Sequence, residues 1–98
     1  MKAVKDPEGF EKDRLHKYVD FNHARVLEVG CGEGRLTWKY AQSADMTFGF
    51  DPLIDTLRVA RADCPADIHN RVHFTNATAY HIPFSSDTFD ITILAWSL

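Results

Sequence analysis

The stretch Val26-Leu27-Glu28-Val29-Gly30-Cys31-Gly32-Glu33-Gly34 decides the fold of this chain. Its first residues belong to a short apolar, β-branched run over 25–29, which predicts a buried β-strand. Three of the five glycines of the chain follow at once. Glycine lets the backbone turn sharply and lets a ligand approach the main chain closely. We therefore predict a strand, a ligand-binding loop and then a helix to about Gln42; the alternative is a tight turn with no ligand.

Helical and strand patterns alternate on both sides of this loop. The patterns predict helices over about 6–20, 34–42 and 53–63, and strands over 25–29, 46–50, 71–75 and 89–96. This alternation is typical of an α/β fold, in which an open parallel sheet has flanking helices. The strand 71–75 alternates like an edge strand, whereas 89–96 is nearly all apolar, like a strand buried on both faces.

Length and composition narrow the function classes. With 98 residues, 45% of them hydrophobic, the chain suits one globular domain. Its net charge of -3 and pI of about 5.9 argue against nucleic-acid binding through a basic surface. No apolar run approaches the roughly 20 residues of a membrane span. Cys31, Cys64 and five scattered histidines show no metal-ligand spacing, and no export signal precedes them, so we expect a cytoplasmic protein without a metal.

Two acidic residues are candidates for ligand binding. Glu28 lies within an apolar strand, where a carboxylate needs a partner. That partner is either a ligand ammonium group, reached directly or through water, or a cation among Arg25, Arg35 and Lys39. Asp51 ends the next strand. Its spacing along the sequence from the glycine loop is the one at which an acid accepts hydrogen bonds from ribose hydroxyls. Its alternative role is to cap the following helix.

The end of the third strand adds an amide. Asn76, with a backbone N–H beside Ala77, can read the edge of an adenine ring, although an Asx turn explains the residue equally well. Leu53 and Ile54 can cover the faces of that ring or belong to the core. The fingerprint of a dinucleotide-binding loop needs a third glycine at the position where this chain has Arg35, which argues against a dinucleotide site. No Gly-Lys-Ser/Thr follows the glycines, so the loop does not match a nucleotide-phosphate-binding loop either.

Together these motifs resemble the class I S-adenosylmethionine-dependent methyltransferases, above all the branch that methylates small molecules. The resemblance covers the chain from about residue 25 onward. It rests on four motifs in the right order: the stretch 26–34, Gly49-Phe50-Asp51-Pro52, Asn76-Ala77 with Ile82-Pro83-Phe84, and Phe89-Asp90-Ile91.

The resemblance implies a role for each matching position. The residues that would face the methionine part of S-adenosylmethionine are Glu28, Gly30, Cys31, Gly32 and Gly34. Asp51, followed by Pro52, would hold the ribose; Leu53 would pack near the adenine, and Asn76 with Ala77 would bind its edge. Ala95 would lie near the transferred methyl group. The Asn/Asp-Pro-Pro-Tyr/Phe motif of enzymes that methylate nucleic-acid amino groups is absent at 95–98.

The family's sheet has seven strands in the order 3-2-1-4-5-7-6, and this chain supplies only the part 3-2-1-4. We therefore expect a truncated cofactor-binding domain, with an N-terminal helix in 1–22 and a core in 25–98. The missing half normally carries much of the acceptor pocket. Its loss would leave the last strand as an open edge through which copies of the chain could pair.

The expected function is methyl transfer from S-adenosylmethionine to a small-molecule acceptor. The alternatives are a catalytically inactive nucleoside-binding or regulatory module, and another nucleotide-binding domain such as a dehydrogenase. Tyr80, His81 and His69 are conceivable bases, but none has an identified partner, so we assign no catalytic residue.

Overall fold

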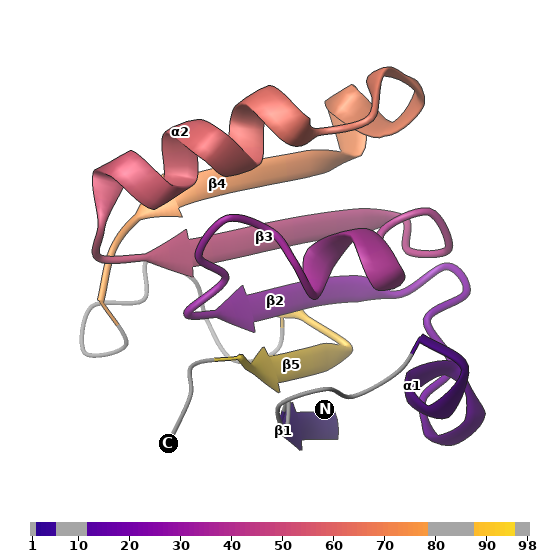
Figure 1. The fold of residues 1–98 in the computed structure, drawn as a ribbon. Coiled ribbons are helices and arrows are strands. Elements are labelled where there is room, and N and C mark those ends of the chain that lie inside the picture. Colours follow the sequence, from indigo (N-terminus) through magenta and orange to yellow (C-terminus); the bar gives the residue numbers. More distant parts are fainter. Residues whose placement is uncertain (1, 6–11, 79–87, 96–98) are drawn as a thin grey trace.

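Five strands form one parallel sheet in the order β1-β5-β2-β3-β4 (Figure 1). The structure is a computed structural model that describes residues 2–5, 12–78 and 88–95. The strands are β1 (Lys2–Lys5), β2 (Arg25–Val29), β3 (Met46–Asp51), β4 (Val72–Asn76) and β5 (Ile91–Leu94). The helices are α1 (Lys12–Tyr18) and α2 (Ile54–Asp63), with short 3-10 turns η1 (Thr37–Lys39) and η2 (Ala66–Arg71).

The four strands predicted from apolar runs are present, and their order is the predicted one. β2 pairs with β3 on one side and with β5 on the other, and β4 follows β3. All these pairs are parallel, as the intervening crossovers require. The predicted α/β fold with an open parallel sheet is therefore confirmed.

The position of β5 corrects one prediction. Lys2–Lys5 pairs in parallel with Ile91–Leu94, so β5 lies inside the sheet and not at its edge. No sequence pattern predicts this strand, because it is only four residues long and two of them are lysines. The proposed pairing of two copies through an open edge of the last strand thus loses its basis.

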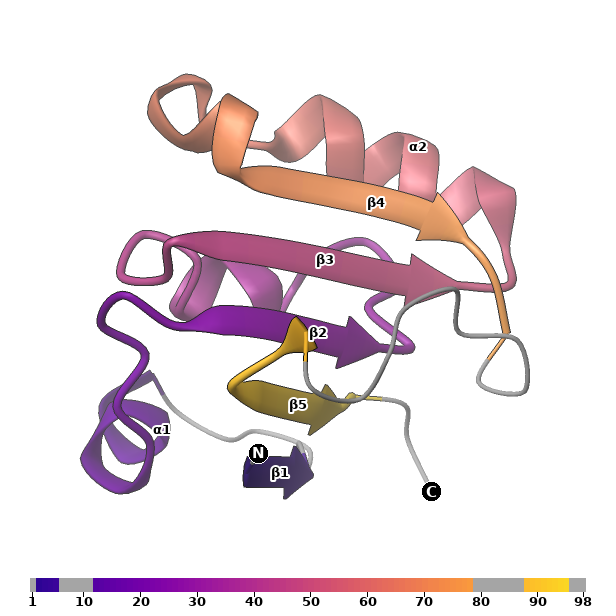
Figure 2. The ribbon, with the colours of Figure 1, turned by 180° about the vertical axis from the view of Figure 1, so that it is seen from behind.

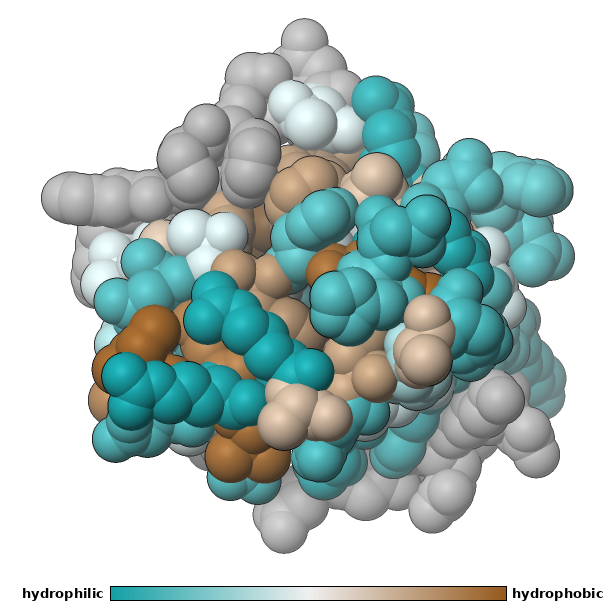
Figure 3. Space-filling view, turned by 90° about the horizontal axis from the view of Figure 1, so that it is seen from above, coloured by the Kyte–Doolittle hydropathy of each residue, from teal (hydrophilic) through white to brown (hydrophobic). Residues whose placement is uncertain are grey.

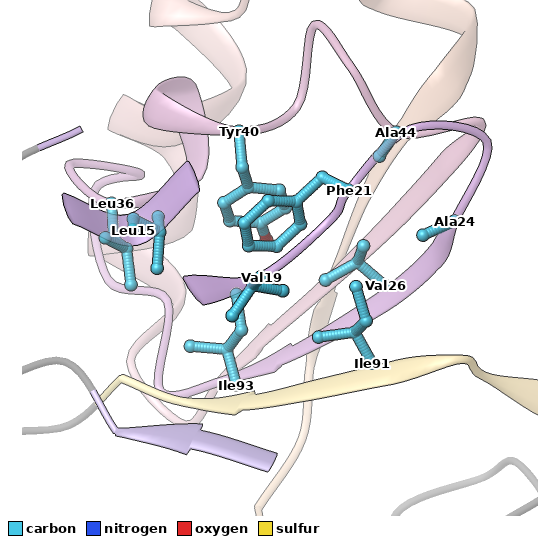
Figure 4. Packing of buried hydrophobic residues seen from close by; sticks show 10 residues of the cluster. All are labelled: Leu15, Val19, Phe21, Ala24, Val26, Leu36, Tyr40, Ala44, Ile91 and Ile93. Carbon is cyan, nitrogen blue, oxygen red and sulfur yellow. The ribbon is translucent and has the colours of Figure 1, made fainter. Parts of the chain in front are cut away.

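One face of the sheet carries a core built around β2 and β5 (Figure 4). Phe21 and Tyr40 stack there with ring centroids 4.8 Å apart. α1 contributes Leu15, and Val19 follows just after it. Tyr18, the last residue of α1, is 59% exposed, and the predicted helix start at 6–11 lies outside the described residues.

On the same side of the sheet, α2 packs over β3 and β4 (Figures 1 and 2). The predicted helix is confirmed, and its Leu57 and Ala60 are fully buried. Leu53 lies just before the helix and is 62% exposed, so it does not belong to the core. From above, Figure 3 shows apolar groups separated by polar side chains. In the described part of the chain, no helix is long and apolar enough to cross a membrane.

The helix predicted over 34–42 is absent. Turns and the three-residue η1 replace it, with N–H groups bonded either three or four residues back. Leu36 and Tyr40 in this segment are nevertheless buried. Thr, Trp and Tyr are weak helix formers, and the Thr37 and Tyr40 hydroxyls both turn inward to bond Glu28. Burial of this carboxylate therefore outweighs regular helix formation.

Candidate functional site

The glycine loop leaves β2 and bends across the end of β3. The N–H groups of Gly30 and Cys31 both donate to the carbonyl of Phe50, at 2.8 and 2.9 Å. The φ angles of Gly30, Gly32 and Gly34 are 79°, 56° and 89°. These values lie in the left-handed region that other residues rarely adopt, so the loop needs glycine at all three positions.

Two of these glycines differ in how much free space surrounds them. A Cβ atom built on Gly34 would lie 2.9 Å from the indole ring of Trp38. This glycine is therefore needed for packing. A Cβ atom on Gly32 would meet no atom within 4 Å. The loop is consequently open at Gly32, where a ligand can approach the main chain.

A cavity of about 320 Å³ opens beside this point. It lies where β2 and β5 end together, since the N–H of Ala95 donates to the carbonyl of Val29 at 2.8 Å. The structure thereby brings together five residues predicted for the methionine end of a cofactor site: Glu28, Gly30, Cys31, Gly32 and Ala95. It also adds lining residues that the sequence analysis missed: Glu33, Arg35, Leu36 and Thr56.

Glu28 is fully buried beneath this cavity. Its Oε1 accepts hydrogen bonds from the Thr37 hydroxyl at 2.6 Å and from the Tyr40 hydroxyl at 2.7 Å. Arg25, one of the cations considered for Glu28, instead bonds the carboxylate of Asp90. Of the three cations considered, Arg25 is thus engaged elsewhere, and the two hydroxyl groups are contacts of Glu28 that the sequence analysis did not predict. The sequence could have indicated these two hydroxyls, because a buried carboxylate such as that of Glu28 needs hydrogen-bond donors nearby.

Burial and nearby negative charge keep the Tyr40 hydroxyl and the Cys31 thiol protonated. Burial and the charge of Glu28 raise the pKa of Tyr40 well above 10, so its hydroxyl remains a donor. Burial, followed by the charges of Glu28 and Asp51, also strongly raises the pKa of the Cys31 thiol. Cys31 is therefore a cavity-lining thiol and not a thiolate nucleophile.

Asp51, the last residue of β3, is hydrogen-bonded to the glycine loop. Its Oδ2 accepts the N–H of Gly32, and its Oδ1 accepts the N–H of Leu53, each at 2.9 Å. The Thr56 hydroxyl lies 3.3 Å from Oδ1 but 2.7 Å from the Leu53 carbonyl. Its single proton goes to the nearer oxygen. The bond to Leu53 forms a turn before α2, whose N-cap is Leu53 and carries no side-chain cap, so the expected capping role of Asp51 is not found. A carboxylate has about four acceptor positions, so Asp51 keeps room for ribose hydroxyls.

Asn76 and Ala77 are joined to the same end of β3. The Asn76 side-chain nitrogen donates to the Asp51 carbonyl at 2.9 Å, and the Ala77 N–H donates to that carbonyl at 3.2 Å. The Ala77 N–H is therefore already used inside the protein. The side-chain oxygen of Asn76 is the group that can still accept from an adenine amino group.

Other predicted residues lie away from the cavity. Gly34, Pro52, Leu53 and the β4 end do not line it, although Pro52 and Leu53 are exposed beside Asp51. His69 borders a different hollow with Arg61 and Val72, and Tyr80 and His81 fall outside the described residues. Within 2–5, 12–78 and 88–95, no three side chains of the His, Cys, Asp and Glu types gather as metal ligands.

Comparisons with known proteins bear on this geometry. Residues 26–98 match the family model described as "Methyltransferase domain". The methyltransferase GfsG of Streptomyces halstedii is 31% identical over 81 residues, which cover 80% of this chain and 29% of that protein.

Two solved structures share the fold. The YcgJ protein of Bacillus subtilis is 26% identical with a TM-score of 0.73, over 84% of this chain and 36% of that one. An S-adenosylmethionine-dependent methyltransferase of Mesorhizobium loti is 22% identical with a TM-score of 0.68, over 84% and 38%. The chain therefore spans about a third of the length of the proteins it matches.

Proposed function

Because the chain belongs to the methyltransferase domain family, whose cofactor is S-adenosylmethionine, we propose that it forms the cofactor-binding part of an enzyme that methylates a small molecule. The observation that carries this proposal is the cavity over the open Gly32, with Glu28 below it and Ala95 on its wall. It lies at the carboxyl ends of parallel strands, where ligands of open α/β sheets bind.

The residues present fit the parts of the cofactor. Glu28 offers a negative charge to the ammonium group of the methionine part, and the loop at Gly32 admits that part against the main chain. Asp51 retains acceptor positions for the two ribose hydroxyls. The Asn76 side-chain oxygen accepts from the adenine amino group, and exposed Leu53 covers the ring. In these assignments the methionine part lies in the cavity, and the ribose and adenine lie at the adjoining ends of β3 and β4.

When bound, S-adenosylmethionine supplies an electrophilic methyl group, which an acceptor atom attacks in line. The chain's own contribution is binding and orientation. Asp51 and the loop hold one another through the Gly32 N–H, so the ribose position and the methionine position are fixed together.

The charge of the chain favours a small-molecule acceptor. A net charge of -3 gives no general attraction to a nucleic-acid backbone. The sequence at 95–98 also lacks the Asn/Asp-Pro-Pro-Tyr/Phe motif of enzymes that methylate nucleic-acid amino groups. Both observations support a small acceptor. Its binding would also involve parts of the fold that the longer relatives contain outside the matched region.

Titration calorimetry tests the cofactor assignment. We expect the chain to bind S-adenosylmethionine and S-adenosylhomocysteine, and to bind NAD at least tenfold more weakly, because Arg35 occupies the place of the fingerprint's third glycine. Binding of NAD alone would show that the proposal is wrong.

A binding module without catalysis is the second candidate, because each role assigned to the residues of the site is binding or orienting the cofactor. Conversion of S-adenosylmethionine to S-adenosylhomocysteine in the presence of small nucleophilic acceptors supports the enzyme. Tight cofactor binding without turnover, in the chain and in any longer form that contains it, supports the module.

A further inference from the structure

Two hydroxyl groups converge on one oxygen atom of Glu28. Thr37 and Tyr40 donate to Oε1 at 2.6 and 2.7 Å, and all three side chains are at most 1% exposed. An ionised carboxylate only accepts hydrogen bonds, so both hydroxyls must donate. Hydrogen bonds to a charged partner are the strong kind, and these two are short.

The irregular backbone after the glycine loop places the two hydroxyls on the same side of the segment. Thr37 and Tyr40 are three positions apart, at the start of η1 and directly after its end. In a 3-10 turn, side chains at this spacing lie above one another, so both face the same strand. In a regular α-helix the two side chains would instead be about 60° apart around the axis.

Fixing one carboxylate oxygen fixes the plane of the whole group. Glu28 also borders the cavity that holds Gly30, Gly32 and Ala95. The position of its charge relative to this cavity is therefore set by two side chains that do not themselves line it. The stacking of Tyr40 on Phe21 in turn fixes the Tyr40 ring.

We propose that Thr37 and Tyr40 are positioning residues that hold the Glu28 carboxylate oriented for the ammonium group of the methionine part of the cofactor. This inference rests on the proposed function. It predicts that the two hydroxyls serve recognition of the ammonium group and not of the nucleoside. A merely structural role would affect every ligand of the site alike.

The test compares two ligands that differ in the ammonium group. S-adenosylhomocysteine carries the amino acid part, whereas 5′-methylthioadenosine lacks it. Calorimetry on the full chain should give Tyr40→Phe and Thr37→Val roughly tenfold weaker binding of S-adenosylhomocysteine, the scale of one weakened charged hydrogen bond. Binding of 5′-methylthioadenosine should stay within about twofold of the unmodified chain, because these contacts are remote from the nucleoside.

Two further variants control for packing. Thr37→Ser keeps the hydroxyl and should restore the binding of S-adenosylhomocysteine. Thr47→Val makes the same chemical change at another fully buried threonine, whose hydroxyl has no hydrogen-bond partner among the described residues, and should leave both affinities unchanged.

Each result decides the inference. Selective loss of S-adenosylhomocysteine binding in either hydroxyl variant, restored by Thr37→Ser, supports it. Equal loss of both ligands, or no change in either, overturns the positioning role while the proposed function stands. If the unmodified chain binds neither ligand, the proposed function itself fails, and the inference fails with it.

Discussion

Replacing Gly32 with alanine should impair ligand binding more than folding. The new methyl group would meet no protein atom within 4 Å, so the main structural cost is the φ angle of 56°. A left-handed conformation costs an L-residue about 1–2 kcal/mol. The N–H that donates to Asp51 is retained. We therefore expect the free energy of unfolding to fall by about 1–2 kcal/mol, with the methyl group occupying the space in which a ligand approaches the loop.

Gly34→Ala is the matched control, since it lies in the same loop with a φ angle of 89°. Its methyl group would lie 2.9 Å from the Trp38 ring, so overpacking adds to the backbone strain. Overpacking costs about 1–3 kcal/mol, and the total loss should therefore be about 2–5 kcal/mol. Gly34 does not line the cavity, so the ligand site itself is spared.

Urea unfolding and calorimetry with S-adenosylhomocysteine separate the two effects. Gly32→Ala should weaken binding by roughly tenfold or more, because a methyl group in a close-packed contact costs of the order of 1–3 kcal/mol. Gly34→Ala should bind within about threefold of the unmodified chain when fully folded, but unfold at lower urea. The reasoning is refuted if Gly32→Ala binds normally, or if it destabilises the chain more than Gly34→Ala does.

Three other predictions concern single side chains. Asp51→Ala should weaken nucleoside binding by roughly 1–3 kcal/mol through the loss of charged hydrogen bonds; unchanged calorimetric affinity would contradict the ribose assignment. Hydrogen bonds from Arg25 lower the pKa of Asp90 below 3.8, so this carboxylate stabilises the fold above that pH, and its contribution disappears as the pH falls through the lowered value. Thermal unfolding should therefore show a deficit for Asp90→Asn at pH 7 that closes on acidification, and a deficit independent of pH would exclude this linkage. Burial raises the pKa of both cysteines, more strongly for Cys31, so mass spectrometry after iodoacetamide treatment at pH 8 should find Cys64 alkylated first; the reverse order would show that Cys31 is not protected.

The sequence was most informative where apolar periodicity is strong. β2, β3, β4, β5 and α2 each follow a run long enough to specify the element. β1 was missed because Lys2–Lys5 has no such run and depends on a backbone distant along the chain. Pattern rules describe local preferences, whereas this strand pairs with a segment distant along the chain.

The site was predicted in its residue types more than in its contacts. The loop, Glu28 and Ala95 meet at one cavity because the parallel strands β2 and β5 end side by side. The sequence could not show that Ala77 has already used its N–H on Asp51. It also could not show that hydroxyls at positions 37 and 40 bond Glu28, since the sequence pattern predicted a regular helix where the structure has turns and η1.

The pairing of β1 with β5 has a consequence for the order of folding. Nearly the whole described chain separates Lys2 from its partner Ile91. Loop closure of this length adds only about 0.6 kcal/mol for each doubling, but contacts between such distant segments slow folding. β2, β3 and β4 can associate from neighbouring segments, whereas β1 has no partner until Ile91–Leu94 has joined β2. We therefore expect β1 to dock last, and its amide hydrogens to exchange with solvent before those of the central strands.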